Sequence, residues 1–180
     1  MNSDPEDKKD DINLRIQPEI IDKMYEESRQ KKEDLDGVVN RILKEYFAWY
    51  KPSKIGGNIP FSKGLISRVF DNLTDELTDK IAHDYVKYEL KDQLVMLGRE
   101  YTLLSFMDAL YCWCEASGFP YVHDRVYNVD KYVIRFDMGP KWAIFFGKFI
   151  QIISEQFKDK NLETEIINNT VVFKIADSLV

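Results

Sequence analysis

Hydrophobic and polar residues alternate strictly over residues 12–17, which read Ile-Asn-Leu-Arg-Ile-Gln. Side chains of a β-strand point alternately to its two faces, so this pattern predicts a strand with one apolar and one polar face. The next extended pattern in the chain begins only at Tyr121. An unpaired strand leaves its backbone N–H and C=O groups without partners. We therefore expect it to pair with the same strand of a second chain, which gives an antiparallel ribbon and a twofold dimer.

Two amphipathic helices are predicted directly after this strand. Pro18 suits the first position of a helix, where its missing N–H costs nothing. Residues 30–33 are polar and predict a break, after which Asp34 or Asp36 can cap the second helix. We expect that helix to end at Pro52, and its apolar stripe is wider than a short helix pair of one chain could cover. The stripe consists of Leu35, Val38, Val39, Ile42, Leu43, Tyr46, Phe47 and Tyr50.

A change of composition divides the chain. Residues 1–11 are charged and mostly acidic, with nothing to bury, and predict a flexible tail. Residues 51–60 contain two prolines and a Gly-Gly pair, which predicts a linker. We therefore expect a small domain over residues 12–50 and a larger one over residues 61–180.

The larger domain is predicted to have an α+β fold. Three helical patterns come first, one of them beginning with the cap Thr74, and Gly98 and Gly118 end the second and third. Alternating patterns then predict two hairpins on either side of an apolar helix that opens at Pro140. We expect the hairpins to join in one antiparallel sheet with that helix across its face. The predicted ranges are helices 61–73, 74–98 and 102–117, a hairpin 121–127 and 131–138 turning around 128–130, helix 140–157, and a hairpin 162–167 and 170–175 turning at 168–169.

Charge and cysteine content limit the classes of function. The formal net charge of −6 provides no general attraction to nucleic acid or anionic membranes, so any nucleic-acid contact must be local. Cys112 and Cys114 lie about 200° apart around a helix, so they cannot share one metal ion, and we expect one buried and one partly exposed thiol. Such free cysteines, a polar start of the chain and the lack of a long apolar run predict a cytoplasmic protein without a membrane span.

Catalytic and metal-binding patterns are not evident in the sequence. It contains no P-loop, GxGxxG, GxSxG or HExxH pattern, so we predict neither an enzyme nor a cofactor. His83 and His123 have no His or Cys neighbour at ligand spacing, and we expect surface or hydrogen-bonded roles for them. The aromatic residues between Tyr111 and Phe146 are expected to be mostly core, although a pocket for an apolar ligand or a partner helix is an alternative.

Residues 12–50 resemble the ribbon-helix-helix DNA-binding proteins of the Arc, MetJ and CopG type. The resemblance is carried by residues 12–16, by Pro18 at the start of the first helix, and by Val39, Leu43 and Phe47 at core positions of the second helix. In that family two strands pair and enter the major groove of DNA. No family is identified for residues 61–180.

The resemblance implies a site on the polar face of the ribbon and at the second helix. Asp11, Asn13 and Arg15 would face the bases, with Gln17 close to the end of the strand; Arg pairs with guanine and Asn with adenine. A DNA phosphate would bind at the start of the second helix. That anchor comprises Asp34, Leu35 and Asp36, up to Gly37.

The predicted function is that of a homodimeric or tetrameric DNA-binding transcriptional repressor of prokaryotic type. Residues 61–180 would bind a small-molecule or protein effector, or assemble dimers on DNA. Residues 1–58 contain 11 basic and 13 acidic side chains, a net charge of −2, which gives no surplus for counterion release. A dimeric ligand- or protein-binding module whose ribbon serves only dimerisation is therefore the first alternative, and an enzyme in the α+β domain is the second.

Overall fold

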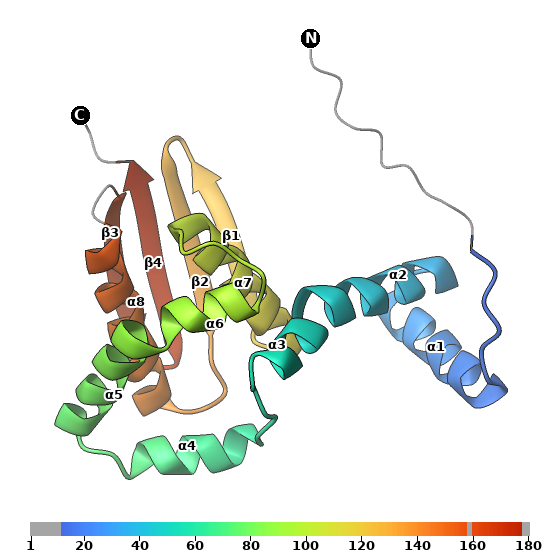
Figure 1. The fold of residues 1–180 in the computed structure, drawn as a ribbon, viewed down its shortest axis with the longest axis horizontal. Coiled ribbons are helices and arrows are strands. Elements are labelled where there is room, and N and C mark those ends of the chain that lie inside the picture. Colours follow the sequence, from blue (N-terminus) through green and yellow to red (C-terminus); the bar gives the residue numbers. More distant parts are fainter. Residues whose placement is uncertain (1–11, 158–159, 178–180) are drawn as a thin grey trace. The chain divides into compact units, whose positions relative to one another are not determined.

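The computed structural model of the chain describes residues 12–157 and 160–177 (Figure 1). The chain divides into two compact units, residues 1–44 and residues 45–180. Helices come first and a four-stranded antiparallel sheet comes last, so the predicted α+β class is confirmed. Among the described residues, no helix is both long enough and apolar enough to cross a membrane. The predicted tail 1–11 lies outside the described residues.

The first unit contains the two helices predicted from the sequence. Helix α1 (Pro18–Lys31) begins at its proline, and it ends because Lys32 adopts a left-handed conformation with φ of 55°. Helix α2 (Leu35–Glu45) is capped by Asp34, whose Oδ1 accepts a hydrogen bond from the Gly37 amide at 2.7 Å. Residues 12–17 belong to no strand of the single chain. The ribbon that they would form with a second chain stays a prediction.

The second helix does not end at Pro52 as predicted. It passes into a π-helical segment, η1 (Tyr46–Tyr50), and then into α3 (Lys51–Ile55). The Lys51 amide bonds to the Tyr46 carbonyl, five residues back. A proline inside a regular α-helix lacks a donor and collides with the carbonyl four residues earlier. The wider π turn directly before Pro52 relieves this conflict, which is why the helical path continues to Ile55.

Four further helices follow the loop after α3. They are α4 (Lys63–Asp71), α5 (Asp75–Tyr88), α6 (Leu90–Met96) and α7 (Leu103–Ser117). The Thr74 hydroxyl caps α5 as predicted, but the single helix expected over 74–98 is interrupted at Glu89, whose φ and ψ are −120° and −35°. Gly98 and Gly118 have φ of 71° and 64°, and each lets the chain leave a helix in the left-handed conformation.

The sheet combines both predicted hairpins. Strands β1 (Tyr121–Val126), β2 (Val129–Arg135), β3 (Lys160–Ile167) and β4 (Thr170–Asp177) lie in the order β1-β2-β4-β3. The second turn falls at the predicted Asn168, whose φ is 54°. The first turn was predicted at residues 128–130, one to two residues too late, because Val126 pairs with Val129 and leaves Tyr127 and Asn128 in the loop.

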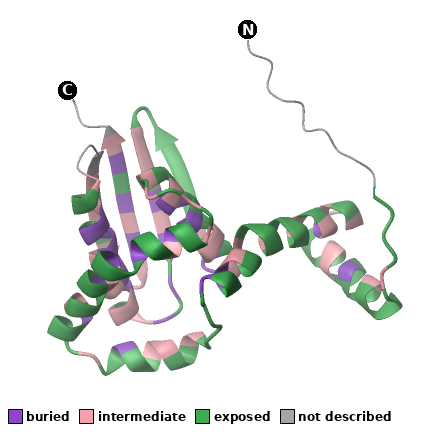
Figure 2. Cartoon of the chain, in the orientation of Figure 1, coloured by how far each residue is buried: buried purple, intermediate pink, exposed green. Residues whose placement is uncertain are grey.

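Helix α8 (Pro140–Gln156) lies across a face of the sheet, as predicted (Figure 1). The core includes residues of the sheet, of α8 and of helices α5, α6 and α7. Helix α8 packs on β3 and β4 with one side and on α4 and α5 with the other. Its approach to β3 is close at Gly147, where an added Cβ would lie 2.5 Å from Cδ1 of Ile166. Strand β1 forms an edge of the sheet and is exposed at five of its six positions (Figure 2).

Candidate nucleic-acid interface

The predicted base-reading residues lie on an accessible segment that belongs to no helix or strand. Asn13, Arg15 and Gln17 are exposed, and they alternate with Ile12 and Leu14, which are 77% and 60% exposed. The remaining predicted site residue of this segment, Asp11, lies outside the described residues. The backbone at Gln17 is extended, with φ of −63° and ψ of 141°. A segment of this kind can add to another strand, and its polar side chains would then share one face.

The predicted phosphate anchor at the start of α2 already holds a carboxylate. Oδ1 of Asp34 accepts the Gly37 amide, one of the N–H groups that would otherwise face a bound anion. Asp36 is exposed in the first turn, and Leu35 is half-buried. Acidic groups at a helix N-terminus stabilise the helix, and they also repel an approaching phosphate.

An ion-pair network holds α1, the turn and α2 together. The Arg41 guanidinium donates to Oε1 of Glu33 from Nε at 3.0 Å and from Nη2 at 2.8 Å, and Nη2 also donates to Oε1 of Glu27 at 2.7 Å. The hydrogen bonds to Glu33 raise the pKa of Arg41 above its ordinary value. Burial lowers this pKa, but by a smaller amount. This network was not predicted, because Glu27 and Arg41 are far apart in the sequence and match no capping or helical-spacing pattern.

The first unit has little core of its own. Only Met24 and Val38 are buried among its described residues. Large apolar side chains remain exposed on residues 12–17 and on both helices, at Ile12, Leu14, Ile20, Tyr25, Ile42 and Leu43. Within residues 12–44, seven basic and seven acidic side chains cancel, so the unit has no net positive charge. The unit is therefore better suited to apolar association than to general attraction to a polyanion.

The cysteines and histidines of the second unit lie as the sequence predicted. Cys114 is fully buried and Cys112 is half-buried. His83 is exposed and bonds to the Asp79 carbonyl, and Nε2 of His123 lies 2.8 Å from Oδ1 of Asp130. No three His, Cys, Asp or Glu side chains among the described residues converge to hold a metal ion.

The aromatic residues between Tyr111 and Phe146 mostly belong to the core or pack against it, as expected, but Tyr111 and Tyr127 are exposed. Trp113 stacks on Phe146 with 5.5 Å between the ring centroids. Tyr132 of β2 stacks on Phe173 of β4 with 5.0 Å between the ring centroids. Two surface depressions of the second unit are open to solvent. One is lined by Gly118, Pro120, Arg135, Phe136 and Asp137, and the other by Ser62, Gly64, Leu65 and Arg68.

The Lys141 ammonium at the start of α8 is bound by backbone carbonyls of α4 and of the loop that follows it. Lys141, in the first turn of α8, donates through Nζ to the carbonyls of Leu73 at 2.6 Å and Asp71 at 3.2 Å. These bonds satisfy the C-terminal end of α4, so Lys141 joins two helices. The structure thus explains Lys141 without a ligand, and the residues of the N-terminal segment remain the best candidates for a functional site.

Comparison with known proteins identifies no relative that would decide between these alternatives: no protein-family model matches the chain, and no curated protein has significant sequence similarity to it.

Proposed function

We propose that the chain is a homodimeric DNA-binding transcriptional regulator that acts as a repressor in the cytoplasm. In this proposal residues 12–50 of two chains form a ribbon-helix-helix, and residues 61–180 serve regulation or assembly. The observation that carries the proposal is the accessible segment of residues 12–17, which belongs to no strand of the single chain and stands in front of two helices with almost no core. A strand with alternating faces and no partner within the described chain needs a second molecule.

Apolar exposure supports the second chain as that partner. Covering a half-exposed Ile or Leu contributes about 1 kcal/mol, so the exposed apolar residues of the first unit would contribute several kcal/mol per chain. A twofold dimer covers the same patch on both copies at once. Pairing of the two strands would also satisfy the backbone groups of residues 12–17. One arrangement, an antiparallel ribbon with its apolar face inward, would both cover the apolar side chains and pair the backbone groups.

The polar face of such a ribbon has suitable chemistry for reading DNA. With Ile12, Leu14 and Ile16 turned inward, Asn13 and Arg15 would point outward from both strands. Arg can donate two hydrogen bonds to guanine, and Asn can bond in two places to adenine. Each such pair discriminates between bases by about 1–3 kcal/mol.

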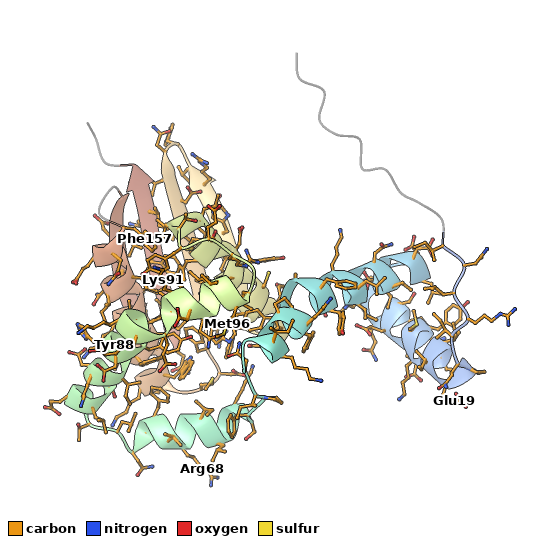
Figure 3. All side chains as sticks on the ribbon, in the orientation of Figure 1. Glu19, Arg68, Tyr88, Lys91, Met96 and Phe157 are labelled. Atoms are coloured by element: carbon orange, nitrogen blue, oxygen red, sulfur yellow. The ribbon has the colours of Figure 1, made fainter. Side chains whose placement is uncertain are left out.

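Binding to DNA is tested best by fluorescence anisotropy on the full-length chain with duplexes selected from a random pool. Arg15→Ala should weaken binding to the selected duplex at least tenfold, because each dimer loses two base contacts. Arg68→Ala is a matched control, since Arg68 lies exposed on α4 in the other unit (Figure 3). Equal binding by the Arg15→Ala variant and the unchanged protein would refute base reading by the ribbon.

A second function is favoured by the acidic start of α2. The Asp34 carboxylate on the Gly37 amide and the cancelled charge of residues 12–44 both disfavour phosphate binding. In this alternative the ribbon serves only dimerisation of a ligand- or protein-binding module. Sedimentation velocity, combined with the duplex selection, separates the two functions. A stable dimer that selects no duplex at 50 mM salt supports the binding module. A monomer at micromolar concentration contradicts both functions.

A further inference from the structure

Strand β1 has an open edge in the single chain. It stands at one end of the strand order β1-β2-β4-β3, and in the described part of the chain it packs mainly against β2 and α7 (Figure 1). Each residue of β1 pairs with one residue of β2, so the strand contains no bulge, and it contains no proline. Bulges, prolines and covering elements are the usual protection of a sheet edge. Without them, the edge of β1 can pair with a further strand.

The pairing with β2 determines which backbone groups of β1 point to this edge. The Arg135 amide donates to the Pro120 carbonyl at 3.0 Å, so these two residues form a hydrogen-bonded pair. Hydrogen-bonded and non-hydrogen-bonded pairs alternate along an antiparallel ladder. Residues 122, 124 and 126 therefore bond to β2. The residues whose N–H and C=O groups point to the open edge are Tyr121, His123 and Arg125.

The side chains on the helix side of β1 differ in charge between its two ends. Near the start, Tyr121 packs edge-on against Tyr111 of α7, with 5.4 Å between the ring centroids. The negative charge of Glu115, also on α7, raises the pKa of Tyr111 more than burial does, so this carboxylate lies near the tyrosine pair. Near the end, the Arg125 side chain is 62% exposed, and its Nε lies 3.9 Å from Oδ1 of Asp130. One end is therefore acidic and aromatic, and the other carries an accessible cation.

These two ends match each other when two β1 strands pair antiparallel about a twofold axis. Such an axis is perpendicular to the sheet, so edge-pointing residues pair with edge-pointing residues of the second copy. With the axis at His123, all three find partners: His123 lies opposite itself, and Tyr121 lies opposite Arg125. An axis one residue earlier or later pairs one of the three with a residue outside the strand. The axis at His123 also brings each guanidinium to the Tyr121 ring and toward Glu115 of the other copy, and both attract it.

We infer that β1 is a self-association edge, through which two copies of the second unit join their sheets into one about a twofold axis at His123. A second copy is the partner because the edge is complementary to itself, with a cation opposite an acidic aromatic patch at two places. On the other face of the sheet, the exposed Val126 would lie opposite the exposed Pro120 of the second copy. This association involves the second unit alone. It goes beyond the proposed function and depends neither on DNA nor on the ribbon.

Disulfide trapping on the full-length chain tests the position of the axis. Each variant has one added cysteine in a Cys112→Ser background, and Cys114 stays because it is buried. The two Cα atoms of residue 123 would be about 5.5 Å apart, within the range of a disulfide. Those of residue 122, or of residue 124, would be about 8 Å apart, which is beyond that range. In a buffer of oxidised and reduced glutathione, His123→Cys should therefore form a linked dimer several-fold more than Val122→Cys or Asp124→Cys. Linkage of His123→Cys no greater than that of either neighbour would overturn the inference.

Charge reversal tests the same interface without an added cysteine. Arg125→Glu places like charges together and should weaken association about tenfold or more, measured by sedimentation velocity at micromolar concentration. Arg125→Lys should retain association, and Glu115→Lys added to Arg125→Glu should restore it. Tryptophan fluorescence verifies that each variant is folded.

The charge-reversal result is independent of the proposed function. Arg125→Glu should halve the sedimenting mass whether or not the ribbon also dimerises, and any dimer that remains in this variant reports on the ribbon alone. A folded Arg125→Glu chain with the same sedimenting mass as the unchanged protein would contradict self-association through β1. A double variant that fails to reassociate would contradict the pairing of Arg125 with the acidic patch.

Discussion

Gly147 lies where helix α8 approaches strand β3, and its replacement by alanine should destabilise the second unit. The added Cβ would lie 2.5 Å from Cδ1 and 2.6 Å from Cγ1 of Ile166, closer than real Cβ contacts occur. Overpacking of this kind costs about 1–3 kcal/mol. Alanine would regain at most about 1 kcal/mol through its better helix propensity. We therefore expect Gly147→Ala to lower the free energy of unfolding by about 1–2 kcal/mol.

Urea unfolding followed by tryptophan fluorescence measures this effect, because all three tryptophans belong to the second unit. Gly64→Ala is the matched control: Gly64 lies in α4 with open space where its Cβ would go, so that change should be neutral or stabilising. Adding Ile166→Ala to Gly147→Ala should cost less than the sum of the single changes, by about 1 kcal/mol or more. A Gly147→Ala chain at least as stable as the original, or strict additivity with Ile166→Ala, would refute the reasoning.

Three further predictions concern charge and thiols. Arg41→Ala removes the hydrogen bonds to both glutamates and should destabilise the first unit by about 1–2 kcal/mol, measured as faster hydrogen exchange of α2 amides. Asp34→Asn keeps the cap but removes its charge; if α2 binds phosphate, DNA affinity should rise about two- to fivefold, and unchanged affinity would exclude that anchor. Burial raises the pKa of Cys114 to about 12, so the stability this thiol contributes is complete below pH 9 and is lost as the pH rises toward 12. The urea concentration at the unfolding midpoint should accordingly decrease as the pH rises above 9, and it should decrease less steeply in the Cys114→Ala variant. In the native protein, a thiol reagent should modify the half-buried Cys112 before the buried Cys114.

Elements set by local chemistry were predictable from the sequence. Thr74 caps α5, Gly118 ends α7 and Asn168 turns the second hairpin, and each acts through its own backbone or its nearest neighbours. The alternating pattern over residues 131–138 also predicted a strand there, and Tyr132 and Ile134 form the buried face of β2, because one-sided burial requires that period.

Features set by distant residues were not predictable. The first hairpin turns at Tyr127, with φ of 54°, because β2 is paired on both sides and Tyr132 lies opposite both His123 and Phe173. This pairing fixes the register, and the turn must follow it although Asn128-Val129-Asp130 has the more typical turn composition. Likewise, no local signal in the sequence shows that Pro52 would be accommodated by a π turn.

The charge balance of the first unit restricts how the proposed regulator would bind DNA. A protein that neutralises 6–10 phosphates loses affinity by about 10³–10⁵ between 50 and 200 mM salt. Residues 12–44 have no net positive charge, and Arg41 is engaged with Glu27 and Glu33. The first unit can therefore neutralise few phosphates. Its affinity for DNA should fall by much less than about 10³ between 50 and 200 mM salt. Discrimination would then have to come from base contacts of Asn13 and Arg15, since weak general attraction leaves little non-specific binding to compete with them.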